Sequence, residues 1–380
     1  MRDSVDPILV EALTSRLIRE GVTGIEEFIS LRYTAFGNPL EVLELEKRAS
    51  LPLHPNEIAV RMILSPINPS DLIPIRGAYA HRMNLPTIPG YEGVGVVEEI
   101  GSSVPRSLLG QRVLPLRGEG TWQQYVKTTA NVAVRVPDGV DDETASQIYV
   151  NPVTAWLICK DELQLNADDV LIANACGSAI GRVFAQLSNA FGYRLIAIAR
   201  NDLHTQQLAL RGAWAVINTS KESLLDRVME LTQGKGATAG IDSIGGLDGH
   251  ALIDCIRPRG HVLSIGLLSG IPLDWAQIHQ KHPVVIVKPY WLRRWIEGVS
   301  DVQWHETFED LFRLVTEGTL QMDSARQRFG LHEYKKAISG AEQRGLPGKV
   351  LFSFEPSSGK TAVRASPLRR VASIDPPLTS

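Results

Sequence analysis

Cysteine is scarce in this chain of 380 residues, which contains only three. Cys159, Cys176 and Cys255 are widely spaced and lie among apolar or small residues. This arrangement indicates neither a disulfide framework nor a cluster of zinc ligands. A reducing, cytoplasmic compartment therefore suits the protein best.

An excess of basic charge and a long hydrophobic run are also missing. The formal net charge is -3, so nucleic acid and anionic membranes are poor candidates for an electrostatic partner. No apolar run approaches the ~20 residues that span a bilayer, and the first residues lack the basic and then apolar order of a signal peptide. We therefore expect neither a nucleic-acid partner nor a membrane partner.

The stretch from Asp169 to Phe191 has the pattern of a strand, a turn and a helix. The run Val170–Ile172 suits a strand buried on both faces, and apolar residues then recur at helical spacing. Between them lies Cys176–Gly181, in which only the last glycine of G-x-G-x-x-G is in register. Such a turn can hold a pyrophosphate on backbone N–H groups, and the residues expected to do so are Gly177, Ser178, Ala179, Ile180 and Gly181. A turn in an α/β protein that binds no nucleotide is the alternative.

The spacing of apolar residues changes along the chain. Together with the length of 380 residues, this change suggests two domains. Short β-like runs broken by Pro and Gly occupy about residues 30–151 and indicate a compact, barrel-like β domain. From Asn151 to about Val287 apolar strands alternate with helical patterns, the signature of a doubly wound α/β domain. A last strand at 349–354 follows two further helices, 307–317 and 331–343, and we expect this part to return to the first domain.

The two ends of the chain differ from these domains. Residues 7–20 have the spacing of an amphipathic helix, within an N-terminal extension assigned to 1–30. Residues 355–380 are rich in Pro, Ser and Arg without an apolar period, which predicts a disordered tail.

Several motifs occur in an order that resembles one enzyme superfamily. They are Ile67–Asp71, Arg76–Tyr79, Leu85–Gly93, Gly120–Trp122, Val150–Trp156, Asp242–Gly246 and Tyr290–Leu292. Over residues 31–354 the chain resembles the medium-chain dehydrogenase/reductase superfamily, and within it the zinc-independent 2-enoyl-thioester reductases of mitochondrial type and the quinone oxidoreductases. The resemblance implies a GroES-like β-barrel catalytic domain, 31–151 and 296–354, and a Rossmann cofactor domain, 152–295.

The ligands that hold catalytic zinc in the alcohol dehydrogenases of this superfamily are replaced here. Asn68 stands where the family has a Cys, and Tyr91 replaces the His of its Gly-His-Glu motif. Residues 145–156 contain neither Cys nor His, so tetrahedral zinc lacks a ligand set. We expect no metal, and hydride addition to an activated C=C bond is the chemistry that remains.

Tyr79 is the expected catalytic residue. Adding a hydride to the β-carbon of an enoyl thioester places negative charge on the thioester oxygen, and the α-carbon then needs a proton. The Tyr79 hydroxyl can serve either purpose, and it occupies the Gly-x-Tyr position of the family's catalytic tyrosine. A tyrosine that merely covers the β domain is the alternative.

The end of the second Rossmann strand predicts the cofactor. An enzyme that uses NAD places an acid there, whereas this chain has Arg200 followed by Asn201, and a guanidinium can pair with a 2′-phosphate. NADPH is therefore expected, although Asp202 tempers the argument. The resemblance adds further cofactor-binding residues: Asn68, Asn151, Thr154, Ile265, Gly266, Tyr290, Trp291 and Lys349.

The resulting hypothesis is NADPH-dependent reduction of the C2=C3 bond of a 2-enoyl thioester on CoA or acyl carrier protein, by a homodimer. An NADPH-dependent reductase of quinones or other activated alkenes is the nearest alternative. A protein that binds NADPH without catalysis is the third hypothesis. The chain length of the acyl group does not follow from the sequence.

Overall fold

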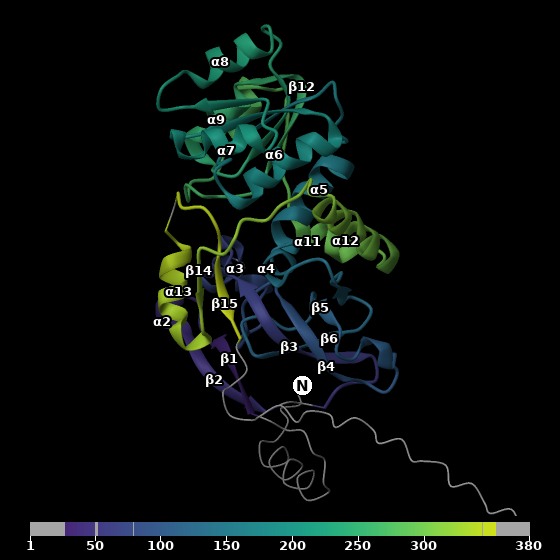
Figure 1. Cartoon of the computed structure of the whole chain (residues 1–380). Helices are drawn as coiled ribbons and strands as arrows, with labels where there is room; N and C mark the ends of the chain where they lie inside the picture. Colours follow the sequence, from purple (N-terminus) through teal and green to yellow (C-terminus); the bar gives the residue numbers. More distant parts are fainter. Residues whose placement is uncertain (1–26, 50–51, 79, 344, 355–380) are drawn as a thin grey trace, which may run out of the picture.

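The computed structural model describes residues 27–49, 52–78, 80–343 and 345–354, and these form two lobes (Figure 1). The expected helix at 7–20 and the expected tail at 355–380 lie outside the described residues. Two large sheets, one in each lobe, organise the described chain, and a two-stranded sheet accompanies them. This is the mixed α/β architecture that the sequence predicts.

The lower lobe in Figure 1 contains a seven-stranded sheet with the order β14-β15-β3-β4-β5-β7, and β6 pairs with β3. Its strands are β3 (Glu57–Pro66), β4 (Val94–Ile100), β5 (Arg112–Leu114), β6 (Tyr125–Thr129), β7 (Val134–Arg135), β14 (Gln327–Phe329) and β15 (Val350–Ser353). The separate hairpin consists of β1 (Glu27–Tyr33) and β2 (Leu43–Ala49). The antiparallel pairing of β15 with β3, Phe352 opposite Ser65, brings the end of the described chain back to this sheet.

The upper lobe contains a parallel six-stranded sheet with the order β10-β9-β8-β11-β12-β13. Its strands are β8 (Val170–Ala173), β9 (Arg194–Ala199), β10 (Ala215–Asn218), β11 (Ala237–Asp242), β12 (Ile256–Ser264) and β13 (Ile286–Pro289). The helices are α6 (Ala179–Phe191), α7 (Thr205–Leu210), α8 (Leu224–Leu231), α9 (Gly246–Ile253) and α10 (Trp275–Lys281). The strand order reverses between β8 and β11, and ligands bind at such a switch point in open α/β sheets.

Several helices and helical turns lie at the junction of the two lobes. They include α4 (Asp142–Ser146), the π-helical turns η3 (Tyr149–Val153) and η4 (Ile158–Glu162), α5 (Thr154–Leu157), α11 (Leu292–Gly298) and α12 (Asp301–Thr316). Pro152 lies inside η3 and lacks the N–H that a regular α-helix requires, which accounts for the wider turn.

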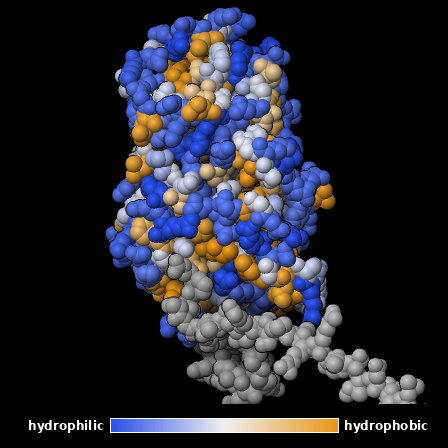
Figure 2. All heavy atoms as spheres, viewed as in Figure 1, coloured by the Kyte–Doolittle hydropathy of each residue, from blue (hydrophilic) through white to orange (hydrophobic). Residues whose placement is uncertain are grey.

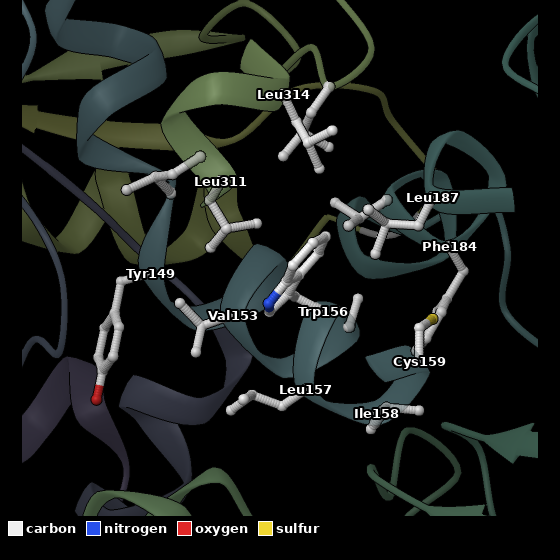
Figure 3. Packing of buried hydrophobic residues seen from close by; sticks show 14 of the residues in the cluster. Tyr149, Val153, Trp156, Leu157, Ile158, Cys159, Phe184, Leu187, Leu311 and Leu314 are labelled. Atoms are coloured by element: carbon white, nitrogen blue, oxygen red, sulfur yellow. The ribbon is translucent and has the colours of Figure 1, made fainter. Parts of the chain in front are cut away.

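One hydrophobic cluster extends through this junction into both sheets. It contains Leu64 and Val94 of the lower sheet together with Leu171 of the upper sheet. Figure 3 shows Trp156 of α5 between side chains of α6 and α12, and its ring centroid lies 5.1 Å from that of Phe191. A continuous packed core therefore joins the two lobes.

Several expected elements have different boundaries in the structure. The helix expected from residue 307 begins at Asp301, because Ser300 and Gln303 form a capping box at its start. The expected strand at 122–126 is β6 at Tyr125–Thr129, and α10 was not anticipated. The expected last helix is split into η6 (Leu331–Glu333) and α13 (Tyr334–Ala341). By contrast, β8, α6 and β9 have the boundaries that the pattern predicts.

Candidate active site

The turn between β8 and α6 is closely packed from behind. Ser178 begins the helix, and its Oγ accepts a hydrogen bond from the Gly181 N–H at 3.3 Å. A Cβ on Gly181 would lie 2.4 Å from the Cys176 Cα, and one on Gly177 would lie 2.3 Å from the His204 ring. A side chain at Gly181 would meet backbone, and one at Gly177 would require the His204 ring to move. The first N–H groups of α6 can take an anion.

Cys176 is part of the packing of this turn. Its side chain is fully buried, and its thiol donates to the Ala173 carbonyl at 3.1 Å. Burial raises the pKa of the thiol to about 12, which keeps it protonated at neutral pH. Cys176 is therefore a packed turn residue and not an activated nucleophile.

The end of β9 has the charge pattern expected for a 2′-phosphate. Arg200 is exposed and makes no ion pair among the described residues. The neighbouring Asp202 is held by an ion pair with Lys221 and by the Asn218 Nδ2 at 2.7 Å. Asn201 caps the turn η5 (Asp202–His204) by accepting from the Leu203 N–H at 3.0 Å. Asp202, the acid that weakens the prediction of NADPH, is thus already paired with Lys221 and Asn218.

One pocket collects predicted cofactor residues from both lobes. Asn151, Gly177, Ser178, Ala179 and Lys349 all contribute to its lining. Cationic and acidic side chains complete the wall of the pocket, namely Arg182, Arg211 and Asp323. The structure therefore brings together five residues that the sequence separates by up to two hundred positions.

A buried carboxylate lies beside this pocket. Glu92 has a fully enclosed side chain whose Oε1 accepts from the Asn68 Nδ2 and from the Lys349 Nζ, both at 2.8 Å. Its Oε2 accepts from the Val150 N–H at 2.7 Å. Three segments that are distant in sequence therefore meet at one side chain.

A second buried carboxylate, Asp71, lies in the same region. It accepts from the backbone N–H groups of Asn68 at 2.7 Å and Tyr91 at 3.0 Å. Desolvation raises the pKa of Asp71 to about 7, with the nearby Glu92 acting in the same direction. Asp71 holds two loop backbones, whereas Glu92 holds side chains as well.

The remaining cofactor candidates occupy the ends of the β11 and β12 strands and the junction. Ile265 donates its N–H to the Asp242 carbonyl at 2.8 Å, and a Cβ on Gly266 would lie 2.7 Å from the Ser243 carbonyl oxygen. Thr154 is buried, and its hydroxyl donates to the Val150 carbonyl at 2.6 Å. Gly266 therefore lets two strand ends approach closely beside the switch point.

The segment from Tyr290 places its aromatic residues differently. Tyr290 is half-buried and donates its N–H to the Ser264 carbonyl at 2.9 Å. Trp291 is 43% exposed with the Arg294 guanidinium over its ring, so it does not belong to the core. Trp295 stacks on Trp304, with ring centroids 5.5 Å apart, and packs against the hydrophobic core.

Tyr79, the predicted catalytic residue, lies outside the described residues. It follows α3 (Pro69–Ile75) and precedes the exposed turn η1 (Ala80–Arg82), which contains His81. The role of Tyr79 is therefore still a prediction from the sequence.

Two site residues were missed by the sequence reasoning. Glu92 was read only as part of the Gly-Tyr-Glu-Gly motif, although an acid between two glycines was a usable signal. Arg182 is almost fully buried on α6, where it pairs with Asp323 and with the Gly177 carbonyl. An arginine on the apolar face of a predicted helix was the signal for it.

The donor groups of the site suit a phosphorylated dinucleotide. The turn has the glycine cradle and the helix start for a pyrophosphate, and Arg200 and Lys349 add positive charge. The buried Asn68 Oδ1 has no hydrogen-bond partner among the described residues, which leaves an acceptor for an outside donor. In the described part of the chain, no three His, Cys, Asp or Glu side chains lie where they could hold a metal ion.

Two stretches of the chain match known families. Residues 54–138 match the alcohol dehydrogenase GroES-like domain, and residues 179–304 match the zinc-binding dehydrogenase family. With the fold and the site above, these matches show that the chain belongs to the medium-chain dehydrogenase/reductase superfamily of oxidoreductases, in its zinc-independent part.

The relatives are described either as enoyl reductases or as quinone reductases. The mitochondrial enoyl-[acyl-carrier-protein] reductase of Xenopus tropicalis is 30% identical, over 85% of this chain and 94% of its own. A Bacillus thuringiensis protein provisionally described as an NADPH:quinone reductase is 51% identical, with a TM-score of 0.84 over 86% of this chain and 99% of its own. Escherichia coli quinone oxidoreductase, solved with NADPH, is 25% identical, with a TM-score of 0.77 over the same shares.

No helix within the described ranges is both long enough and apolar enough to cross a membrane. On the face shown in Figure 2, hydrophilic residues predominate, and hydrophobic residues occur among them in small groups.

Proposed function

We propose that the protein is an NADPH-dependent reductase of activated C=C bonds and that its substrate is a 2-enoyl thioester carried on CoA or acyl carrier protein. The cofactor is NADPH. The residues at the end of β9 support NADPH as the cofactor. There Arg200 has no ion pair among the described residues, and Asp202 is held by Lys221 and Asn218. The enoyl thioester rests on the Arg76–Tyr79 motif and on the enoyl reductases among the relatives.

The chain's own groups divide the work of such a reduction. NADPH, when bound, supplies the hydride that the substrate's β-carbon receives. The start of α6, Arg200 and Lys349 would hold the phosphates and position the cofactor across the switch point. The Tyr79 hydroxyl would donate a hydrogen bond to the thioester oxygen, which gains negative charge, or give its proton to the α-carbon.

The test is a pair of measurements on purified protein. Oxidation of NADPH and of NADH is followed spectrophotometrically with crotonyl-CoA, quinones and α,β-unsaturated ketones as acceptors. We expect turnover with NADPH and crotonyl-CoA, and we expect Tyr79→Phe to lower that turnover by at least about 100-fold through loss of the proton donor. A folded Tyr79→Phe protein with full turnover would refute the role of Tyr79.

A quinone reductase is the second candidate, because the Bacillus thuringiensis relative of 51% identity has that description. Turnover with quinones and none with any enoyl thioester would favour it. Tight NADPH binding without oxidation by any acceptor would indicate a protein that binds the cofactor without catalysis.

A homodimer is also part of the proposal. β13 is an edge strand of the upper sheet, and Val284 and Ile286 beside and within it are 54% and 49% exposed. Apolar side chains along an unpaired edge favour association with a second copy. Analytical ultracentrifugation tests this, and a monomer at micromolar concentration would contradict it.

A further inference from the structure

We propose that Glu92 is a positioning residue that aligns Asn68, Asn151 and Lys349 toward the cofactor in this pocket. This inference rests on the proposed function, because it assumes that a nicotinamide nucleotide occupies the cleft. Glu92 itself is enclosed in the protein, so it acts through the residues that it holds.

The geometry explains why an acid occupies this position. The two carboxylate oxygens face three donors: the Asn68 Nδ2, the Lys349 Nζ and the Val150 N–H. Only a group that accepts at both ends satisfies all of them. A glutamine of the same shape would turn its NH2 group toward at least one donor and leave buried groups unpaired.

The carboxylate also determines the orientation of the Asn68 amide. The Glu92 Oε1 accepts from the Lys349 Nζ and from the Asn68 NH2 group, and this bond to the NH2 group directs the Asn68 Oδ1 elsewhere. That Oδ1 is buried and has no partner among the described residues. Asn68 is thus held ready to accept from an outside N–H or O–H donor, such as the amide of a carboxamide.

The other two bonds connect Glu92 with the pocket. Lys349 uses one of the three protons on its Nζ for Glu92, is 11% exposed and contributes to the pocket wall. The bond to the Val150 N–H holds the first turn of η3, whose next residue, Asn151, contributes to the same wall. One side chain therefore sets the spacing between the two sides of the cleft at this point.

The experiment compares Glu92→Gln with a matched control, Asp71→Asn. Asp71 is also a fully buried carboxylate of these loops, but the hydrogen bonds described for it come only from the backbone N–H groups of Asn68 and Tyr91. Both variants place an amide against buried donors and should lower the melting temperature of the cofactor-free protein. Binding of NADPH is measured by fluorescence titration, and turnover is measured with crotonyl-CoA.

We expect Glu92→Gln to raise the Kd for NADPH by about tenfold or more, the effect of losing one hydrogen bond to a charged group. Asp71→Asn alters only the backbone support of Asn68 and Tyr91 and keeps the bonds of Glu92 to Lys349 and Val150. It should therefore raise that Kd clearly less than Glu92→Gln does, by less than about threefold, at a comparable loss of melting temperature. Equal effects of the two variants on the Kd, or an unchanged Kd in Glu92→Gln, would overturn the proposal.

Failure of the proposed function gives a different result. If the wild-type protein binds NADPH but reduces no enoyl thioester, the substrate proposal fails and the titration still tests Glu92. If the wild-type protein binds no NADPH, the cofactor proposal fails, and the role of Glu92 fails with it.

Discussion

At the scale of single residues, two buried carboxylates in the same loops have different properties. Glu92 accepts hydrogen bonds from a lysine and from two further donors. Among the described residues Asp71 accepts two backbone hydrogen bonds, and burial raises its pKa to about 7. Two carboxylates of the same loops are therefore buried with different sets of donors.

The raised pKa of Asp71 predicts a pH dependence of stability. In the unfolded chain an aspartate titrates near pH ~4, so between about pH 4 and pH 7 the folded state binds more protons at Asp71 than the unfolded state. The contribution of Asp71 to stability is therefore fully present below about pH 4 and is lost as the pH rises toward 7.

Urea unfolding of the wild type and Asp71→Asn at pH 5 and pH 7.5 measures this contribution. The difference in unfolding free energy between the two proteins should become smaller at the higher pH, by about 2 kcal/mol or more. A difference that does not change with pH would show that Asp71 is ionised over the whole range.

At the scale of elements, the unit β8–α6–β9 positions the phosphates. The turn follows β8, and Gly181 packs closely against Cys176 within it. Ser178 then caps the N-terminus of α6. The helix ends at Gly192, which has a left-handed conformation with φ 79° and thereby stops α6 before β9. Both ends of α6 are thus determined by residues within the unit.

Gly181→Ala should disturb this unit. The new Cβ would lie 2.4 Å from a backbone atom of Cys176, so α6 must move away from the turn. We expect a loss of about 1–3 kcal/mol in unfolding free energy and weaker binding of NADPH.

Gly298→Ala is the matched control, because a Cβ at this helical glycine meets nothing within 4 Å. That substitution should be neutral or slightly stabilising. Denaturant unfolding and NADPH titration of both variants provide the comparison. Wild-type behaviour of Gly181→Ala would mean that the turn tolerates a side chain.

At the scale of the whole molecule, the two lobes are connected by charges as well as by the shared hydrophobic cluster. Asp323, between α12 and β14, pairs with Arg182 of α6 and with Arg211, whose Nη2 lies 2.7 Å from it. Arg182 also donates to the Gly177 carbonyl in the phosphate turn. The segment that returns to the lower sheet is therefore linked directly to the cofactor turn.

Asp323→Asn should lower the unfolding free energy by about 3 kcal/mol, because Arg182 is 4% exposed and would lose its counter-charge inside the protein. The control is Asp310→Asn, which weakens a pair with Lys160 whose side chains are 30% and 49% exposed. Exposed pairs contribute less than about 1 kcal/mol. Urea unfolding of both variants distinguishes the two cases, and equal losses would contradict the importance of burial.

The sequence by itself was sufficient where the information is local. The strand at Val170–Ala173, the helix at Ala179–Phe191 and the strand at Arg194–Ala199 follow from hydrophobic spacing and from a glycine stop. The motifs also determined the superfamily, because each is a short run of neighbouring residues. Element boundaries were less certain where a cap overrode the hydrophobic pattern, as at Ser300.

Only the tertiary structure decided which distant residues share the site. Glu92 and Lys349 are separated by 257 positions, and Arg182 and Asp323 by 141, yet each pair forms an ion pair. Hydrophobic periodicity carries no information about such contacts, because they depend on how the two lobes pack together. The packing gives Glu92 three hydrogen-bond donors from distant segments. It also pairs Asp202 with Lys221 and leaves Arg200 without an ion pair among the described residues.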